Sequence, residues 1–171
     1  EAGRSIYVAA SGSDEKDGLT ADAAVATLEK AVSIAQDGDT IYVMSDLESH
    51  SLARVTDKRI TITSGDGATY TISRGNGFAT ALDPRSWYNP AMIDVTTHGK
   101  DSSVTLRNIV LDDGGKHEGT IFAQASSTGG TDDNTQMVQD AIVAAYGLGK
   151  DSAKIILDSG AELKNYGGMS A

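Results

Sequence analysis

Short runs of alternating apolar residues, each followed by a turn rich in glycine, asparagine or aspartate, recur along this chain of 171 residues. The clearest run is Arg59–Ser64, in which Ile60 and Ile62 share one face. Val104–Leu111 and Lys154–Leu157 have a similar setting, because a Lys-Asp-Ser turn precedes each run and Asp, then Gly, follows it. This pattern indicates a degenerate repeat of short β-strands. We therefore predict a fold made of many short strands.

The first 46 residues have a different order of elements. Ser5–Ala10 is an apolar strand candidate, and residues 11–20 are dense in turn formers. Apolar residues then recur at helical spacing between Ala26 and Gln36, with Thr27 as the expected N-cap. The turn Asp37-Gly38-Asp39 ends this helix, and a second strand follows at Thr40–Met44. The prediction is strand, turn, short helix, turn, strand.

Short strands at such spacing are compatible with a jelly roll or barrel as well as with a parallel solenoid. We favour the solenoid, a single-stranded parallel β-helix, because the strands are very short. The one clear helix also comes first, where it would cover the open end of the stack as a capping α-helix. The predicted domains are an N-terminal cap over residues 1–46 and the first coils over residues 47–171, continuing beyond the chain end. Inserted loops are expected near 74–91 and 114–140.

Residues 6–43 resemble the N-terminal cap of pectate-lyase-like right-handed parallel β-helix proteins. The matching residues are Tyr7-Val8, Gly12-Ser13-Asp14, Asp17-Gly18, Thr27-Leu28, Ala31-Val32 and Gly38-Asp39-Thr40-Ile41. Residues 155–171 look like a repeat of large bacterial surface β-helices. The resemblance implies an all-β fold, a right-handed winding and an extracellular location. The family includes polysaccharide lyases, lacto-N-biosidase-type glycosidases and adhesins, so the resemblance does not select one activity.

Composition excludes several classes of function. The formal net charge is -10 and no cluster of Lys and Arg exists, so nucleic acid is not an expected partner. The absence of cysteine excludes a disulfide framework and a thiol nucleophile. No run approaches the roughly 18 apolar residues that a membrane span needs, so we expect no membrane span.

Four aspartates are the candidate catalytic residues. Asp112 and Asp113 lie in the densest ionisable cluster, and two carboxylates on one face can act as acid and base in glycoside hydrolysis. Asp133 and Asp140 flank a second apolar stretch. That stretch fits either a helix that includes Met137 to Ala145 and ends at Gly147 or a strand at Ala141–Tyr146. The structural alternative for these aspartates is a set of solvated turn residues.

Aromatic residues and a histidine are the candidate ligand-binding residues. Trp87 and Tyr88 lie in a predicted loop, and their flat rings suit sugar rings, although a lone Trp also serves to pin a loop to a core. His117 belongs to the ionisable cluster after Asp113. The alternative for all three is a packing or solvated role.

Asp14 and Asp17 are the candidate metal ligands. Both lie in one glycine-flanked turn, where hard oxygen ligands suit Ca²⁺, so calcium is the candidate cofactor. The structural alternative is that each carboxylate accepts hydrogen bonds from nearby backbone, as aspartates in turns commonly do.

These features lead to two functional hypotheses. The first is a secreted or cell-surface bacterial protein that binds and processes a glycan or polysaccharide through paired carboxylates. The alternative is a non-catalytic adhesin or surface stalk whose loops bind a host or cell-wall partner. In both cases we expect an extracellular or cell-wall-attached protein. The C-terminal edge would meet the remainder of the solenoid or a second subunit.

Overall fold

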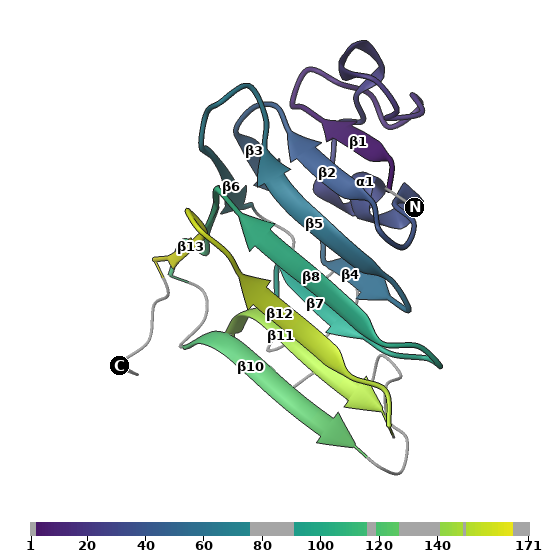
Figure 1. Ribbon diagram of the computed structural model, residues 1–171. Helices are drawn as coiled ribbons and strands as arrows, with labels where there is room; N and C mark the ends of the chain where they lie inside the picture. The colour runs from purple at the N-terminus through teal and green to yellow at the C-terminus, as the bar shows by residue number, and fades with distance from the viewer. Residues whose placement is uncertain (1–2, 76–90, 116–118, 127–140, 149, 166–171) are drawn as a thin grey trace.

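The computed structural model describes residues 3–75, 91–115, 119–126, 141–148 and 150–165. Two short helices lie between the first and second strands, and all later elements are strands (Figure 1). The elements are β1 (Ser5–Val8), η1 (Ala21–Ala23), α1 (Leu28–Ile34), β2 (Thr40–Val43), β3 (Leu47–Ser49), β4 (Ala53–Thr56), β5 (Arg59–Ser64), β6 (Tyr70–Arg74), β7 (Ile93–Thr96), β8 (Ser102–Arg107), β9 (Ile109–Asp112), β10 (Gly119–Ser126), β11 (Ala141–Leu148), β12 (Ala153–Leu157) and β13 (Glu162–Lys164).

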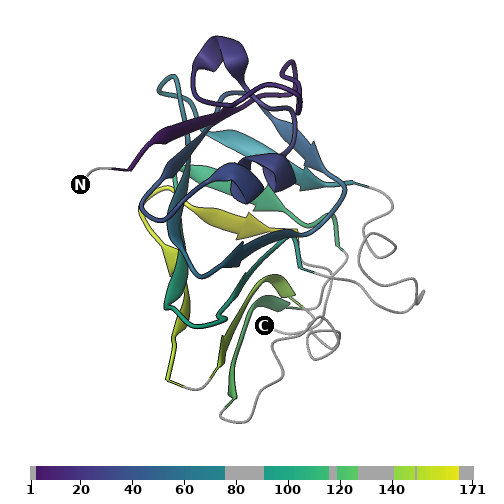
Figure 2. The same cartoon turned by 90° about the vertical axis from the view of Figure 1, so that its right-hand side faces the viewer.

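The strands form three parallel sheets. Sheet A is five-stranded with the order β1-β2-β5-β8-β12, sheet B has the order β13-β9-β6-β3, and sheet C has the order β10-β11-β7-β4. Along the chain, β2, β3 and β4 lie in sheets A, B and C, and β5, β6 and β7 repeat that sequence. Figure 2 shows the three sheets surrounding a common interior. Because the sheets are parallel, all turns that precede the strands of sheet A lie along one edge of that sheet.

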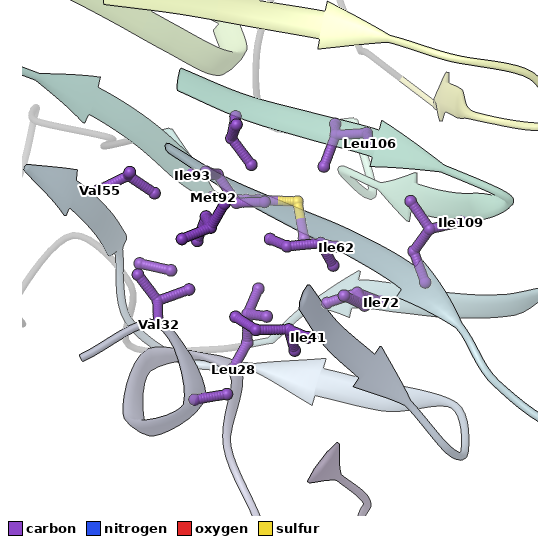
Figure 3. Packing of buried hydrophobic residues seen from close by; sticks show 14 of the residues in the cluster. Leu28, Val32, Ile41, Val55, Ile62, Ile72, Met92, Ile93, Leu106 and Ile109 are labelled. Carbon is purple, nitrogen blue, oxygen red and sulfur yellow. The ribbon is translucent and has the colours of Figure 1, made fainter. Parts of the chain in front are cut away.

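A column of large apolar side chains fills the interior. Ile6, Ile41, Ile62 and Leu106 are in register on β1, β2, β5 and β8, and each has 0% of its surface exposed. Ile72 of sheet B and Ile93 of sheet C belong to the same cluster (Figure 3). Full burial of such a side chain contributes about 1.5–3 kcal/mol. The alternation of apolar and polar residues in the sequence thus directs one apolar face of each of these strands into the core.

Helix α1 contacts β1, β3 and β4. It begins after Thr27, whose hydroxyl accepts a hydrogen bond from the Lys30 amide, and it buries Leu28, Ala31 and Val32. The Lys58 ammonium donates to the carbonyls of Val32 and Ala35, at 2.5 and 2.7 Å. A cation at this position satisfies carbonyls at the helix C-terminus and complements the helix dipole.

The predicted fold class is wrong. A single-stranded right-handed parallel β-helix requires one strand per sheet in each successive turn of one continuous solenoid. The described strands do not meet this requirement throughout, because β10 and β11 follow one another in sheet C without a strand of sheet A or B between them. These two strands have eight residues each and pair with each other over most of their length. This mutual pairing adds a second strand to sheet C before the chain returns to sheet A, and it breaks the expected order.

Several predicted elements are nevertheless confirmed. The strand at Arg59–Ser64 has the predicted bounds, and Lys154–Leu157 falls within β12. Helix α1, with Thr27 as its N-cap, lies inside the predicted range 26–36. The strand alternative is correct for residues 141–146, which belong to β11. The predicted run 104–111 is divided at Asn108, which has a positive φ of 48° and separates β8 from β9.

Replacing Gly12 with alanine is expected to destabilise the N-terminal region by about 1–2 kcal/mol, because overpacking forces the backbone to shift. A Cβ at this position would lie 2.4 Å from the Val25 carbonyl oxygen and 2.5 Å from that of Ala24. Urea denaturation would measure the change. The neighbouring Ser11→Ala is the control and should stay within about 0.5 kcal/mol of the native protein. Equal stabilities of the two variants would contradict this close packing.

Candidate functional site

Asp112 and Asp113 occupy different environments although they are adjacent in sequence. Asp112 ends β9, is half-buried, and its Oδ1 accepts a hydrogen bond from the Gly114 amide at 3.0 Å. Asp113 has 0% of its surface exposed, and its Oδ1 lies 3.8 Å from Nη1 of the equally buried Arg74. Burial lowers the pKa of Arg74 to about 10, and the Asp113 carboxylate acts in the opposite direction. This arrangement gives Asp113 a buried ionic partner and no access to a large substrate.

The candidate calcium ligands make backbone hydrogen bonds. Asp14 Oδ1 accepts from the amides of Ala26 and Thr27, at 2.8 and 3.0 Å, and its Oδ2 accepts from the Thr27 hydroxyl at 2.7 Å. Asp17 Oδ1 accepts from the Leu19 amide at 2.9 Å. Both oxygens of Asp14 therefore connect the first turn to the start of α1. Among the described residues, no group of three or more His, Asp or Glu side chains is placed to hold a metal ion.

Five other predicted site residues lie outside the described residues. They are the candidate catalytic Asp133 and Asp140 and the candidate ligand-binding Trp87, Tyr88 and His117. Their roles stay predictions.

A cavity of about 320 Å³ opens along the edge of sheet A where its strands begin. Its walls come from the turns before β2, β5, β8 and β12. The lining residues are Asp37, Asp57, Arg59, Gly99, Lys100, Asp101 and Asp151. A volume of this size is at the lower end of the range for small-molecule sites. We call it the turn cavity.

Aspartates hold the walls of the turn cavity in place by bonding to the following turn. Asp37 Oδ1 accepts from the Arg59 amide at 2.8 Å, and Asp101 Oδ1 accepts from the Ser152 amide at 2.8 Å. Asp57 Oδ1 accepts from the amides of His98 and Lys100, at 2.6 and 3.2 Å. These bonds use Oδ1 of each carboxylate. The second oxygen of each group remains suited to accept a hydrogen bond from a ligand.

The turn cavity combines both signs of charge. Its lining includes four carboxylates, one guanidinium and one ammonium group. The backbone hydrogen bond from Arg59 lowers the pKa of Asp37, burial opposes this shift, and the Arg59 side chain lowers it further. Asp37 is therefore ionised at neutral pH and lies 3.5 Å from Arg59 Nε. Acceptors and donors placed together in this way suit a ligand that both donates and accepts hydrogen bonds.

The outward face of sheet A continues from the turn cavity. Thr40, Thr61 and Thr105 are in register on β2, β5 and β8, and each is partly exposed. Beside this row, the rings of Tyr7 and Tyr42 stack with centroids 5.6 Å apart and an angle of 23° between their planes. The face therefore offers a row of hydroxyl groups next to a pair of stacked aromatic rings. The predicted site did not include these residues.

The sequence contained one signal for the turn cavity. The triplet Lys-Asp-Ser occurs at residues 100–102 and again at 150–152, each time where a strand of sheet A begins. Parallel register places such repeated turns side by side. Asp37 and Asp57 line the turn cavity because β2 and β5 stack beside β8. The spacing of residues along the sequence does not give this stacking.

Comparison with known proteins found no relative. No protein-family model matches the chain, and neither do curated proteins or solved structures. These comparisons show no family. The resemblance of residues 6–43 to the pectate-lyase-like cap stays a prediction from sequence.

The helices were also compared with the length and hydropathy that a membrane span requires. In the part of the chain that the structure describes, no helix is both long enough and apolar enough to cross a membrane.

Proposed function

We propose that this chain is a non-catalytic carbohydrate-binding protein, secreted or attached to a cell surface, as in the adhesin alternative. The ligand would enter the turn cavity and extend over the outward face of sheet A. The observation that carries this proposal is the mixed set of carboxylates, Arg59 and Lys100 around a cavity of about 320 Å³. Among the described strands, β12 and β13 are the last of sheets A and B, and we propose that their edges are available for a protein partner.

A sugar fits this site better than an ion or an acid does. Each sugar hydroxyl both donates and accepts, so it can bond a carboxylate and an ammonium or guanidinium group at once. The opposed charges in the turn cavity disfavour a strongly charged ligand of either sign. The stacked rings of Tyr7 and Tyr42 add an aromatic surface on the same sheet. Flat aromatic rings are suited to pack against the apolar faces of sugar rings.

Binding without hydrolysis is favoured by the positions of the described carboxylates. Hydrolysis needs two carboxyl groups about 5–9.5 Å apart that flank a substrate bond in a groove. Asp113 is fully buried beside Arg74, and Asp112 bonds the Gly114 amide. In the turn cavity, Asp37, Asp57 and Asp101 bond the backbone of the next turn. These carboxylates serve the stacking of turns, which suits a rigid binding surface.

Replacing Arg59 with alanine is expected to weaken glycan binding at least tenfold, about 1.4 kcal/mol, because a charged hydrogen-bond donor is lost from the site. A glycan array would identify an oligosaccharide ligand, and isothermal titration would measure its affinity for each variant. Lys100→Ala should have a similar effect. Lys164→Ala is the matched control, because Lys164 lies on sheet B and does not line the turn cavity.

Two results would count against the proposal. If no glycan on the array binds, or if Arg59→Ala and Lys164→Ala bind equally well, the turn cavity is not the sugar site. If the bound oligosaccharide is cleaved with release of new reducing ends, the protein is an enzyme and the non-catalytic part of the proposal fails.

A further inference from the structure

Strand β12 is an open edge at one end of sheet A. It pairs with β8 on one side, and no described strand pairs with its other side. The Asp158 amide donates to the Leu106 carbonyl, and the Ser152 carbonyl accepts from the Ser102 amide. Backbone groups point alternately to the two sides of a strand, so those of Ala153, Ile155 and Leu157 point away from β8. These residues present unpaired donors and acceptors to an additional strand.

The apolar core is incompletely covered at this end. The buried column Ile6, Ile41, Ile62 and Leu106 continues in register to Leu157, which is 45% exposed. Ile155 and Leu163 are likewise only partly buried against the core. On the outward face of β12, Ile156 is 43% exposed. Of the three exposed large hydrophobic side chains in the described part of the chain, two therefore belong to this one strand.

The sequence of β12 is complementary to itself when read in the opposite direction. In an antiparallel pair centred on Ile156, Lys154 faces Asp158 of the second copy, and the same contact occurs twice by symmetry. On the core side, Ile155 faces Leu157 of the second copy, again twice. Ile155 and Leu157 both direct their backbone groups to the free edge, so this register also satisfies the hydrogen-bonding pattern of antiparallel strands.

We propose that two copies of this chain associate through β12, with antiparallel pairing centred on Ile156. The contact is a two-fold symmetric interface, in which the same surface of each copy meets itself. It extends sheet A across both copies and covers Leu157 and Ile156 of each. Cross-strand apolar and opposite-charge pairs stabilise such contacts, whereas like charges directly opposite destabilise them. The proposal does not rest on the sugar site, because its evidence is the free edge and the exposed apolar side chains of β12 and not the lining of the turn cavity.

Charge reversal on β12 tests this interface. Sedimentation equilibrium of the 171-residue chain should give twice the mass of one chain at sufficient concentration. Lys154→Asp places two carboxylates opposite each other and should weaken the dimer at least tenfold. The double variant Lys154→Asp/Asp158→Lys exchanges the charges and should restore much of the affinity. Lys16→Asp, an equal charge change in an exposed turn far from β12 in sequence, should leave the dimer unchanged.

Asp158 also forms an ion pair within one copy, because its Oδ2 lies 3.0 Å from Arg107 Nε. A second variant tests the interface without changing either residue of this pair. Ile156→Asp changes an exposed side chain, so the monomer should fold normally by circular dichroism, and the dimer should be lost. A chain that stays monomeric at every concentration would overturn the proposal. A dimer of unchanged strength in Lys154→Asp and Ile156→Asp would also overturn it, since another surface would then hold the copies together.

Discussion

Replacing Asp113 with alanine is expected to lower the free energy of unfolding by about 3–5 kcal/mol, because removing one partner of a buried ion pair leaves the other charge in the interior. Asp113 is 0% exposed, and the Arg74 side chain 3.8 Å away is 1% exposed. Burial lowers the pKa of Arg74 to about 10, the Asp113 carboxylate opposes this shift, and the guanidinium is therefore still charged at pH 7. Urea denaturation at pH 7 would measure the loss.

Asp112→Ala is the matched control for this prediction. Asp112 is the preceding carboxylate, but it is half-buried at the end of β9 and bonds the Gly114 amide, so its loss should cost about 1 kcal/mol or less. The double variant Arg74→Met/Asp113→Leu should recover most of the stability, because an apolar pair can replace a buried ion pair. If Asp113→Ala and Asp112→Ala are equally stable, the buried pair does not support the fold.

This contrast also bears on the predicted catalytic roles. A catalytic carboxylate can be removed with little loss of stability, whereas a buried structural one cannot. Alternation along β9 separates the two aspartates: Leu111 points inward, Asp112 outward, and Asp113 inward again at the corner. Sequence clustering grouped these residues because it records proximity along the chain and not the direction of each side chain.

Strands with one buried and one exposed face were the predictable part of the fold. Arg59–Ser64 alternates, and its structural bounds match the predicted ones. Strand β7 was missed although Ile93–Thr96 alternates apolar and polar residues, because the run has only four residues. In the structure its polar residues, Asp94 and Thr96, are buried like the apolar ones, which the sequence does not indicate.

The order of strands in space was not predictable from local pattern. The solenoid prediction assumed that each strand pairs with its equivalent in the previous repeat. Strand β11 instead pairs with β10 as well as with β7, and this choice depends on long-range register. The lining of the turn cavity could not be predicted for the same reason, since it also depends on long-range register. The Lys-Asp-Ser turns were visible, but Arg59 and Asp37 join them only because β2, β5 and β8 are neighbours in sheet A.

Replacing Asp39 with alanine is expected to cost about 3 kcal/mol of unfolding free energy, since hydrogen bonds to a charged group contribute about 1.5–3 kcal/mol each and several are lost together. Asp39 is 2% exposed. Its Oδ1 accepts from the Arg4 amide at 2.8 Å, and its Oδ2 accepts from Arg4 Nη2 at 2.9 Å and from the Gln36 amide at 2.7 Å. One carboxylate thereby connects β1, the end of α1 and the start of β2.

The same carboxylate makes stability depend on pH. Burial raises the pKa of Asp39, but the hydrogen bonds from Gln36 and Arg4 lower it more, so it lies below the ordinary value of 3.8. A carboxyl group whose pKa is lower in the folded state binds its proton more weakly there than in the unfolded chain. Its contribution is therefore complete above pH 3.8 and is lost as the pH falls through the folded pKa.

Urea midpoints at pH 7 and pH 3 would measure this effect. The pKa values of Asp37 and Asp158 are also lowered, by backbone hydrogen bonds from Arg59 and Ser159, so the native protein and every variant should lose some stability in acid. Asp39→Asn keeps the shape of the side chain but has no proton to gain. Its loss of stability between pH 7 and pH 3 should be smaller than that of the native protein, and an equal loss would show that the Asp39 carboxylate does not carry the acid sensitivity.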